Sequence, residues 1–148
     1  MSTHRPSWDS YGMSLAHIAA LRSEDPFCKV GACALREDNS LAATGYNGPP
    51  PGVSIDWEDR EARRPYICHA EVNCLKYCRP GEVKTLYVSL SPCDACLTTI
   101  AAYGISRVVY SAVYEKSPSS FDIAKKFGIS LTYTCFNLEE YIANYKLI

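Results

Sequence analysis

Residues 85–96 have the sequence TLYVSLSPCDAC, and this stretch decides the fold class. Its first half is an apolar run with β-branched and aromatic residues, which predicts a buried strand. Ser91 then has the character of an N-cap and Pro92 that of a first helical residue, so a helix is expected through residue 103. A further apolar run at residues 107–113 predicts the next strand. Strand, helix and strand in this order are typical of an α/β fold.

The same alternation continues on both sides of this stretch. Asn137 is the expected N-cap of the last helix. Helices are expected at residues 8–23, 69–78, 91–103, 119–127 and 138–145, and strands at residues 30–35, 41–46, 85–90, 107–113 and 129–135. The first two strands would form a hairpin across the polar turn at residues 37–40. We therefore expect a three-layer α/β/α sandwich around a mixed sheet, in a single domain covering residues 1–148.

Residues 47–65 are expected to be irregular. This segment contains the run Pro49-Pro50-Pro51-Gly52 and a charged stretch at residues 56–64. Irregular segments of this length in compact domains are usually functional or mobile.

The composition limits the classes of partner. The 148 residues are 47% hydrophobic and 21% charged, with a formal net charge of −1. Binding to polymeric nucleic acid usually requires a basic surface, so a small molecule is the expected partner. The sequence has no apolar run of the roughly 20 residues needed to span a bilayer, and its start does not lead into an apolar signal core. A cytoplasmic location is therefore expected, with no membrane contact.

The chain has eight cysteines. A secreted disulfide framework would need a signal peptide, which the sequence does not provide. We expect five of them to be reduced thiols that are buried and act as small hydrophobic groups: Cys28, Cys33, Cys74, Cys78 and Cys135.

Two short motifs carry chemistry: His69-Ala70-Glu71 and Pro92-Cys93-Asp94-Ala95-Cys96. Zinc prefers nitrogen and sulfur ligands in a tetrahedron, and a catalytic zinc site keeps one position for water. His69, Cys93 and Cys96 supply the three expected ligands. Glu71 follows His69 by two residues, so it could take a proton from the zinc-bound water and deliver it to a substrate. His-x-Glu followed by Pro-Cys-x-x-Cys is typical of zinc-dependent deaminases.

A redox role or a structural zinc role for the cysteine pair fits the sequence less well. A redox site would use Cys93 and Cys96 but would leave His69 and Glu71 without a role. A closed structural zinc site would need a fourth ligand, for which Cys68 is the available residue.

The chain resembles the deoxycytidylate (dCMP) deaminase branch of the cytidine deaminase superfamily over nearly its whole length. The segments that carry the resemblance are Arg22-Ser23-Glu24-Asp25-Pro26, Val30-Gly31-Ala32, Gly45-Tyr46-Asn47-Gly48, Cys68-His69-Ala70-Glu71-Val72-Asn73, Leu86-Tyr87-Val88 and Ser91-Pro92-Cys93-Asp94-Ala95-Cys96. The resemblance implies a five-stranded sheet flanked by helices, one catalytic Zn²⁺, and hydrolysis of dCMP to dUMP for thymidylate synthesis.

The resemblance also implies roles for substrate-binding residues. Asn47 would contact the sugar or the base, unless the Asn-Gly pair is only a turn. Tyr114, just after an expected strand, would lie near the base and the phosphate. The cations nearest the expected phosphate are Arg22, Lys29 and Lys116; guanidinium and ammonium groups suit a phosphate, although each is equally compatible with a solvated surface charge.

Regulated members of this family bind dCTP and dTTP near residues 48–65 and are hexameric, so these effectors and a homo-oligomer, hexamer or dimer, are compatible with the resemblance. The match is looser here, because Val53 stands where a different residue is expected. Arg60, Arg63 and Arg64 could bind an effector's phosphates, but the interspersed acidic residues favour a solvated charged turn.

Other activities share parts of the pattern. A tRNA adenosine deaminase needs a basic face, whereas the last helix begins with acidic residues. Free-cytidine deaminases usually have cysteine in place of His69. The zinc ligands alone do not distinguish guanine, pterin-type or dCTP deaminases, and a non-catalytic zinc-stabilised module is the alternative from another class.

Overall fold

The computed structural model describes residues 4–145 and residue 147. The strands are β1 (Gly31–Arg36), β2 (Leu41–Tyr46), β3 (Val83–Val88), β4 (Arg107–Tyr110) and β5 (Ser130–Tyr133). The helices are α1 (Trp8–Ala20), α2 (Arg60–Arg63), α3 (Ala70–Leu75), α4 (Asp94–Ala102), α5 (Ser120–Lys126) and α6 (Leu138–Asn144), and Arg64–Tyr66 forms a 3-10 turn, η1.

The strands form a single five-stranded sheet in the order β2-β1-β3-β4-β5. The first hairpin is antiparallel, and β1 also pairs antiparallel with β3. The remaining pairs, β3 with β4 and β4 with β5, are parallel, so α4 and α5 form the crossovers between them. The prediction of a mixed sheet is confirmed.

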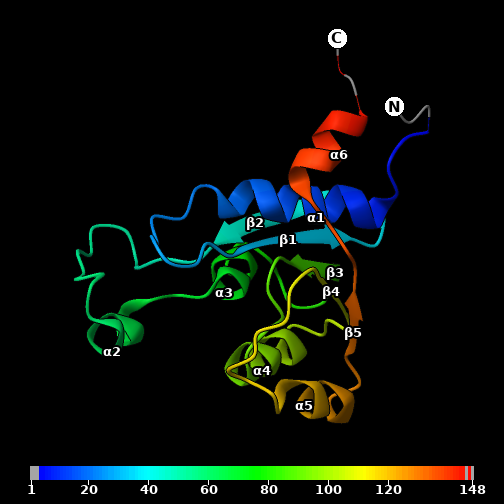
Figure 1. Ribbon diagram of the computed structural model, residues 1–148. Helices are drawn as coiled ribbons and strands as arrows, with labels where there is room; N and C mark the ends of the chain where they lie inside the picture. Colours follow the sequence, from blue (N-terminus) through cyan, green and yellow to red (C-terminus); the bar gives the residue numbers. More distant parts are fainter. Residues whose placement is uncertain (1–3, 146, 148) are drawn as a thin grey trace.

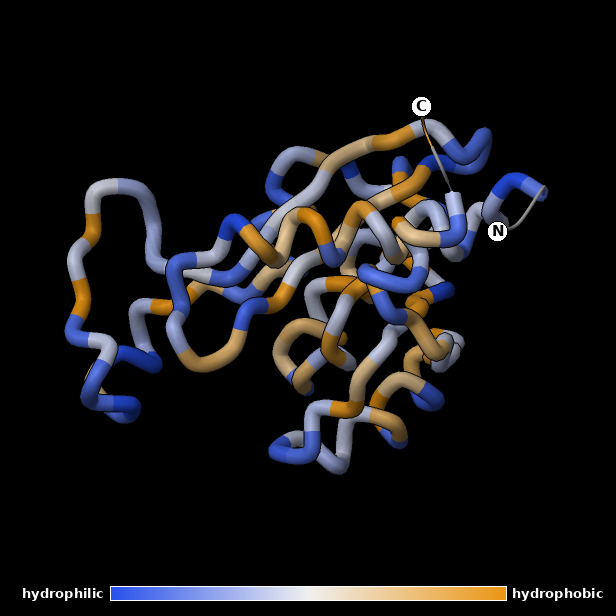
Figure 2. Tube along the Cα trace, turned by 45° about the horizontal axis from the view of Figure 1, so that its top comes forward, coloured by the Kyte–Doolittle hydropathy of each residue, from blue (hydrophilic) through white to orange (hydrophobic). Residues whose placement is uncertain are grey.

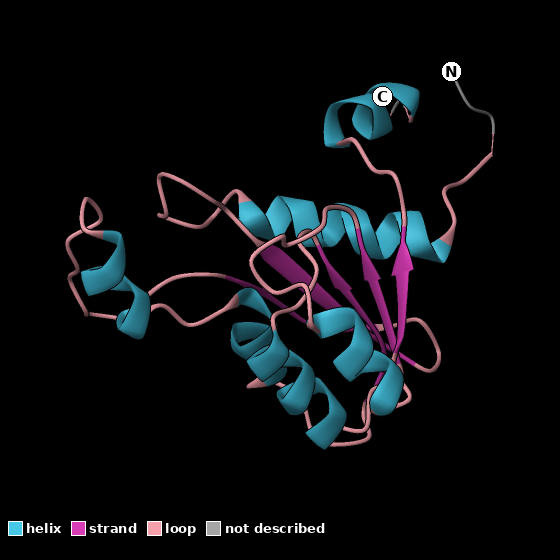
Figure 3. Ribbon diagram, turned by 60° about the horizontal axis from the view of Figure 1, so that its bottom comes forward, coloured by secondary structure: helices cyan, strands magenta, loops and turns pink. Residues whose placement is uncertain are grey.

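Helices cover both faces of the sheet (Figures 1 and 3). In β1, Cys33 and Leu35 pack on the face that α1 covers, in one cluster with Met13 and Ala16. The alternate residues of β1 join a larger cluster under α3, α4 and α5 on the opposite face. Burial on both faces is what a central strand with an unbroken apolar run requires. The three-layer prediction is thus confirmed, with α6 lying against α1 on the outer side (Figure 1). No helix of the described residues is long and apolar enough to cross a membrane.

One edge of the sheet collects the ends of several strands. In the register of the sheet, Gly31 pairs with Tyr46 and Val88 pairs with Tyr110. The carboxyl ends of β2, β3 and β4 therefore lie at the same edge, beside the start of β1. In open α/β sheets, ligands bind beyond the carboxyl ends of the strands. The segments that follow these three strands are the ones that form the site described below.

A long arm, residues 49–67, leaves this edge between β2 and α3 (Figure 1). Two backbone hydrogen bonds between Gly48 and Cys68, of 3.0 and 2.8 Å, close its base. The segment expected to be irregular is so up to residue 59, and α2 and η1 then form within it. Asp59 caps α2 by accepting a hydrogen bond from the backbone N–H of Ala62 at 3.1 Å. Hydrophilic residues gather at the α2 end of the arm (Figure 2).

The start of α4 differs from the prediction. Its N-cap is Cys93 rather than Ser91, and the helix begins at Asp94. Ser91 has another role: its hydroxyl oxygen accepts a hydrogen bond from the backbone N–H of Tyr114, and its own N–H donates to the carbonyl of Ala112. The same two contacts explain why the strand expected at residues 107–113 ends at Tyr110, since the chain beyond it turns toward Ser91.

The cysteine prediction is correct for three of its five residues. All eight cysteines are free. Cys33, Cys74 and Cys78 are buried as expected, whereas Cys28 and Cys135 are exposed. Cys135 follows the edge strand β5, where no further strand covers it.

Candidate active site

The three predicted metal ligands meet at one point. The Nδ1 atom of His69 lies 3.4 Å from the Sγ atom of Cys93 and 3.3 Å from that of Cys96. All three ligand atoms lie within 4.8 Å of one another. Usual Zn–N and Zn–S bond lengths in a tetrahedron give an N···S separation of about 3.5 Å, so the donor set and its spacing fit zinc. Cys68 is not part of this group, and the closed four-ligand alternative has no support.

Local structure explains why these side chains are free to bind a metal. His69 is the N-cap of α3 and Cys93 is the N-cap of α4, both in extended backbone conformation. Neither side chain caps its own helix, so both point into the space between the two helix starts. Exposed N–H groups at helix N-termini favour a thiolate, which is the form of cysteine that binds metal.

The protonation of the two sulfurs agrees with this role. The pKa of Cys93 is lowered to about 4, because the thiol of Cys96 donates a hydrogen bond to it and His69 lies alongside. The pKa of Cys96 is raised by the same hydrogen bond and by burial. The pKa of His69 is raised mainly by its hydrogen bond with Cys93, while the charge of Arg64 acts in the opposite direction.

Glu71 lies in the first turn of α3 and is 4% exposed. Burial raises the pKa of its carboxyl group, and the side chain contacts that of Cys96. A carboxyl group that is buried beside the metal ligands, with its affinity for protons increased, is suited to carry protons during a reaction. This is the position that the sequence predicts for Glu71.

A pocket opens from this cluster. Its walls come from the segments that follow β2, β3 and β4, from the loop after α1, and from the starts of α3 and α4; the arm is part of the segment after β2. The lining residues are Asp25, Cys28, Val30, Asn47, Arg60, Arg63, Arg64, Ile67, His69, Ala70, Glu71, Leu90, Ser91, Cys93 and Tyr114.

Asn47 lines the pocket but is largely occupied by the protein. Its amide nitrogen donates to Asp25 Oδ2 at 3.3 Å and to the carbonyl of Cys28 at 2.9 Å. Its Oδ1 accepts a hydrogen bond from Val30 N–H at 2.9 Å. Both N–H donors are therefore used to hold the pocket wall, and Oδ1 keeps one lone pair. The predicted substrate contact through Asn47 stays a prediction, restricted to that acceptor.

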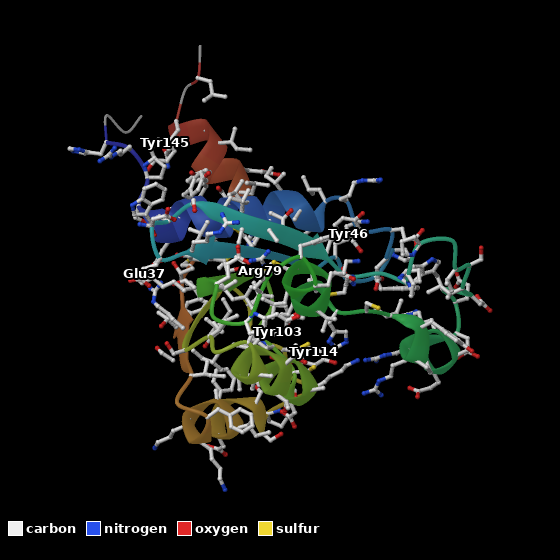
Figure 4. The ribbon with its side chains drawn as sticks, turned by 180° about the vertical axis from the view of Figure 1, so that it is seen from behind. Glu37, Tyr46, Arg79, Tyr103, Tyr114 and Tyr145 are labelled. Carbon is white, nitrogen blue, oxygen red and sulfur yellow. The ribbon has the colours of Figure 1, made fainter. Side chains whose placement is uncertain are left out.

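Tyr114 lines the pocket on the opposite side, next to the start of α4 (Figure 4). Its backbone N–H donates to Ser91 Oγ at 2.7 Å. The same loop is tied to α4 by Ser117 and Ser119, whose hydroxyls donate to the two carboxylate oxygens of Asp94 at 2.9 and 2.7 Å. The loop is therefore fixed to the helix that carries two of the metal ligands.

The cations predicted for the phosphate are not the ones that the pocket contains. Arg22, Lys29 and Lys116 are exposed and do not line it, and the Lys29 ammonium group donates to the carbonyl of Ser23. The pocket instead contains the three arginines of the arm, for which the sequence favoured a solvated turn. Because acidic residues alternate with these arginines, the sequence pattern favours a solvated turn over an arginine cluster. The Asp59 cap, which directs this short helix, was the signal that could have indicated an ordered arginine cluster.

Comparison with known proteins assigns the family. Residues 6–112 match the family described as "Cytidine and deoxycytidylate deaminase zinc-binding region". The chain belongs to the dCMP deaminase family of this superfamily. Family membership and the geometry of His69, Cys93 and Cys96 together establish a zinc-binding region, with Zn²⁺ as its metal.

Three relatives illustrate the similarity. The deoxycytidylate deaminase of Mycobacterium phage D29 is 42% identical over 125 residues, covering 72% of this chain and 95% of that protein. The mouse deoxycytidylate deaminase is 38% identical over 113 residues, which cover 70% of this chain but 64% of that protein. The crystal structure of the cyanophage S-TIM5 dCMP deaminase in complex with dCMP and dUMP superimposes with a TM-score of 0.76 at 26% identity, covering 88% of this chain and 99% of that chain.

Proposed function

We propose that this protein hydrolyses dCMP to dUMP and ammonia, supplying dUMP for thymidylate synthesis. The observation that carries the proposal is the meeting of His69, Cys93 and Cys96 with the buried carboxyl group of Glu71 in one pocket. Support for the nucleotide comes from the relatives, several of which are dCMP deaminases, and from the arginines at the pocket.

The reaction adds water at C4 of the cytosine ring and releases the amino group as ammonia. His69, Cys93 and Cys96 would hold the zinc ion, which would supply a coordinated water with its pKa lowered toward neutrality. Glu71 would accept a proton from the attacking water and donate it to the ring nitrogen, and would then take the second proton from the hydroxyl group added at C4 and deliver it to the departing amino group. Its burial suits this exchange, because burial raises the pKa of the carboxyl group and so increases its affinity for a proton.

Rival substrates are less well matched to the chain. A tRNA stem-loop would need a basic face, whereas the formal net charge is −1 and the first turn of α6 is acidic. Guanine lacks a phosphate and would leave the pocket arginines without an anion. Deaminases of dCTP and non-catalytic zinc modules share the ligand set, so the choice of dCMP depends on the arginines and the relatives.

Assembly, regulation and location are part of the proposal. We expect a homo-oligomer, hexamer or dimer, in the cytoplasm, without contact to membrane or polymeric nucleic acid. The arm occupies the region where regulated relatives are expected to bind dCTP and dTTP, and these remain the candidate effectors.

Ammonia release from a panel of substrates tests the function. The zinc-loaded protein is assayed with dCMP, dCTP, deoxycytidine, guanine and a tRNA stem-loop, with and without a chelator. We expect the highest kcat/KM with dCMP and its loss on chelation. Equal rates on dCMP and deoxycytidine would overturn the nucleotide assignment. Turnover of guanine alone, or of tRNA alone, would show that the protein is a guanine deaminase or a tRNA deaminase instead. No turnover at all by the zinc-loaded protein would favour a non-catalytic zinc-stabilised module.

A further inference from the structure

Three arginines of the arm share the pocket with the metal ligands. Arg60 and Arg63 come from α2 and Arg64 from η1, and all three line the pocket that contains His69 and Glu71. In Figure 4, side chains that end in nitrogen lie between α2 and Tyr114. A ligand that reaches these arginines therefore occupies the same pocket as a base bound at the metal.

The arginines differ in what holds them. The guanidinium carbon of Arg63 lies 4.4 Å from the ring centroid of Phe27, and its Nη1 donates to the carbonyl of Trp57 at 2.5 Å. The contact with Phe27 fastens the arm to the loop after α1, and the bond to Trp57 holds Arg63 within the arm. The side chains of Arg60 and Arg64 have no hydrogen bond and no ion pair with any residue that the structure describes. Two guanidinium groups are thus free to bind an anion.

Nearby acidic groups do not neutralise this pair. Asp59 directs a carboxylate oxygen to the start of α2. Asp25 lines the pocket, but one of its carboxylate oxygens accepts the backbone N–H groups of Phe27 and Cys28, and the other accepts Asn47 Nδ2. Glu71 lies at the metal cluster and is buried. Among the residues that the structure describes, none of these carboxyl groups forms an ion pair with Arg60 or Arg64.

We infer that Arg60 and Arg64 bind the 5′-phosphate of the nucleotide substrate, in place of the exposed cations that the sequence predicts. The inference depends on the proposed deamination of a nucleotide. Planar guanidinium groups bind phosphate through paired charge-assisted hydrogen bonds, and a phosphate held there fixes the base at the other end of the pocket. The arm then selects charged nucleotides over nucleosides.

Kinetics with and without the phosphate test this role. The Arg60→Gln/Arg64→Gln variant is compared with the wild type on dCMP and on deoxycytidine. A hydrogen bond to a charged group contributes about 1.5–3 kcal/mol, so kcat/KM for dCMP should fall at least about 10-fold, mainly through KM. Activity on deoxycytidine should stay within about 2-fold. An equal fall on both substrates, or on neither, contradicts the inference.

Lys125→Gln/Lys126→Gln is the matched control, because it removes two exposed cations from α5, outside the pocket. Its kinetics should equal those of the wild type. Calorimetry provides a readout that does not need turnover: the zinc-loaded wild type should bind dUMP at least about 10-fold more tightly than deoxyuridine, and the arginine variant should lose this difference. If the wild type bound dUMP without deaminating dCMP, the proposed function would fail and the phosphate site would stand. If the variant kept its preference for dUMP, the phosphate site would fail.

Discussion

Gly45 of β2 lies directly against the backbone of Cys74 in α3: a Cβ atom at Gly45 would come within 2.4 Å of the Cys74 nitrogen and within 2.7 Å of the Ala70 carbonyl oxygen. These are backbone atoms of α3, so no flexible side chain could move away. The glycine therefore allows α3, which carries Glu71 and begins at His69, to pack on the sheet at this distance.

Gly45→Ala should consequently displace α3. We expect a loss of about 1–3 kcal/mol in the free energy of unfolding, as for other overpacked sites, together with weaker zinc retention. Urea unfolding and zinc analysis after dialysis measure both quantities. Gly48→Ala is the control, because a Cβ atom there would meet nothing within 4 Å. A Gly45→Ala protein as stable as the control would show that this close approach does not position α3.

The metal ligands should differ sharply from the other cysteines. Cys96→Ser should lose most of its zinc and become less stable, because folding and metal binding are coupled at such sites. Cys135→Ser, which changes an exposed thiol outside the cluster, should keep one zinc per chain. Elemental analysis and thermal melting with and without a chelator measure the effect. Full zinc retention by Cys96→Ser would contradict the ligand assignment.

The hydrogen bond from Tyr114 to Ser91 should affect substrate binding. Ser91→Ala leaves the backbone N–H of Tyr114 without its acceptor, which costs about 1–3 kcal/mol when the group stays buried. We expect a higher KM for dCMP with zinc content unchanged, because the loop that carries Tyr114 loosens. Ser106→Ala, at an exposed position before β4, is the control. An unchanged KM would indicate that the bonds to Asp94 hold the loop alone.

Stability at low pH should depend on Asp9. Two hydrogen bonds from Arg107, at 2.9 and 2.7 Å, lower the pKa of the Asp9 carboxyl, and Tyr87 also donates to it. A lowered folded-state pKa means that the stabilisation is present above the unfolded value near 3.8 and is lost as the pH falls through the lower folded value.

Asp9→Asn should therefore reduce the free energy of unfolding at pH 7 by about 0.5–1 kcal/mol, since the pair is partly exposed, and the difference from the wild type should shrink below pH 4. Urea titrations between pH 7 and pH 3 measure this. Glu37→Gln is the control. It breaks the ion pair between Lys84 and Glu37, in which the Glu37 side chain is 85% exposed, and it should change the free energy of unfolding little at any pH. A difference for Asp9→Asn that is constant with pH would exclude the charge as its cause.

The sequence predicts the fold and the metal cluster because both depend on local patterns. Alternating strands and helices locate the layers, and Cys93 and Cys96 are one helical turn apart at a helix start, so their convergence needs no long-range information. The helix start itself was predicted two residues early. Ser91 is a good N-cap by composition, but a tertiary contact with Tyr114 uses its hydroxyl group.

The pocket wall could not be predicted in the same way. Which cations reach the pocket depends on the path of the arm, and that path is fixed by the Gly48–Cys68 bridge and by the contact of Arg63 with Phe27. Neither contact has a signature in the sequence. The two N–H donors of Asn47 likewise bind Asp25 and the carbonyl of Cys28. These contacts join separate loops, so the spacing of residues in the sequence does not predict them.

Zinc content and turnover measured on the same preparations of wild type and Glu71→Gln test the central claim most directly. Glutamine keeps the shape of the side chain but does not carry protons. We expect one zinc per chain in both proteins and a loss of about 10²- to 10⁴-fold in kcat for dCMP in the variant. Turnover by Glu71→Gln at the wild-type rate, with zinc bound, would contradict the account.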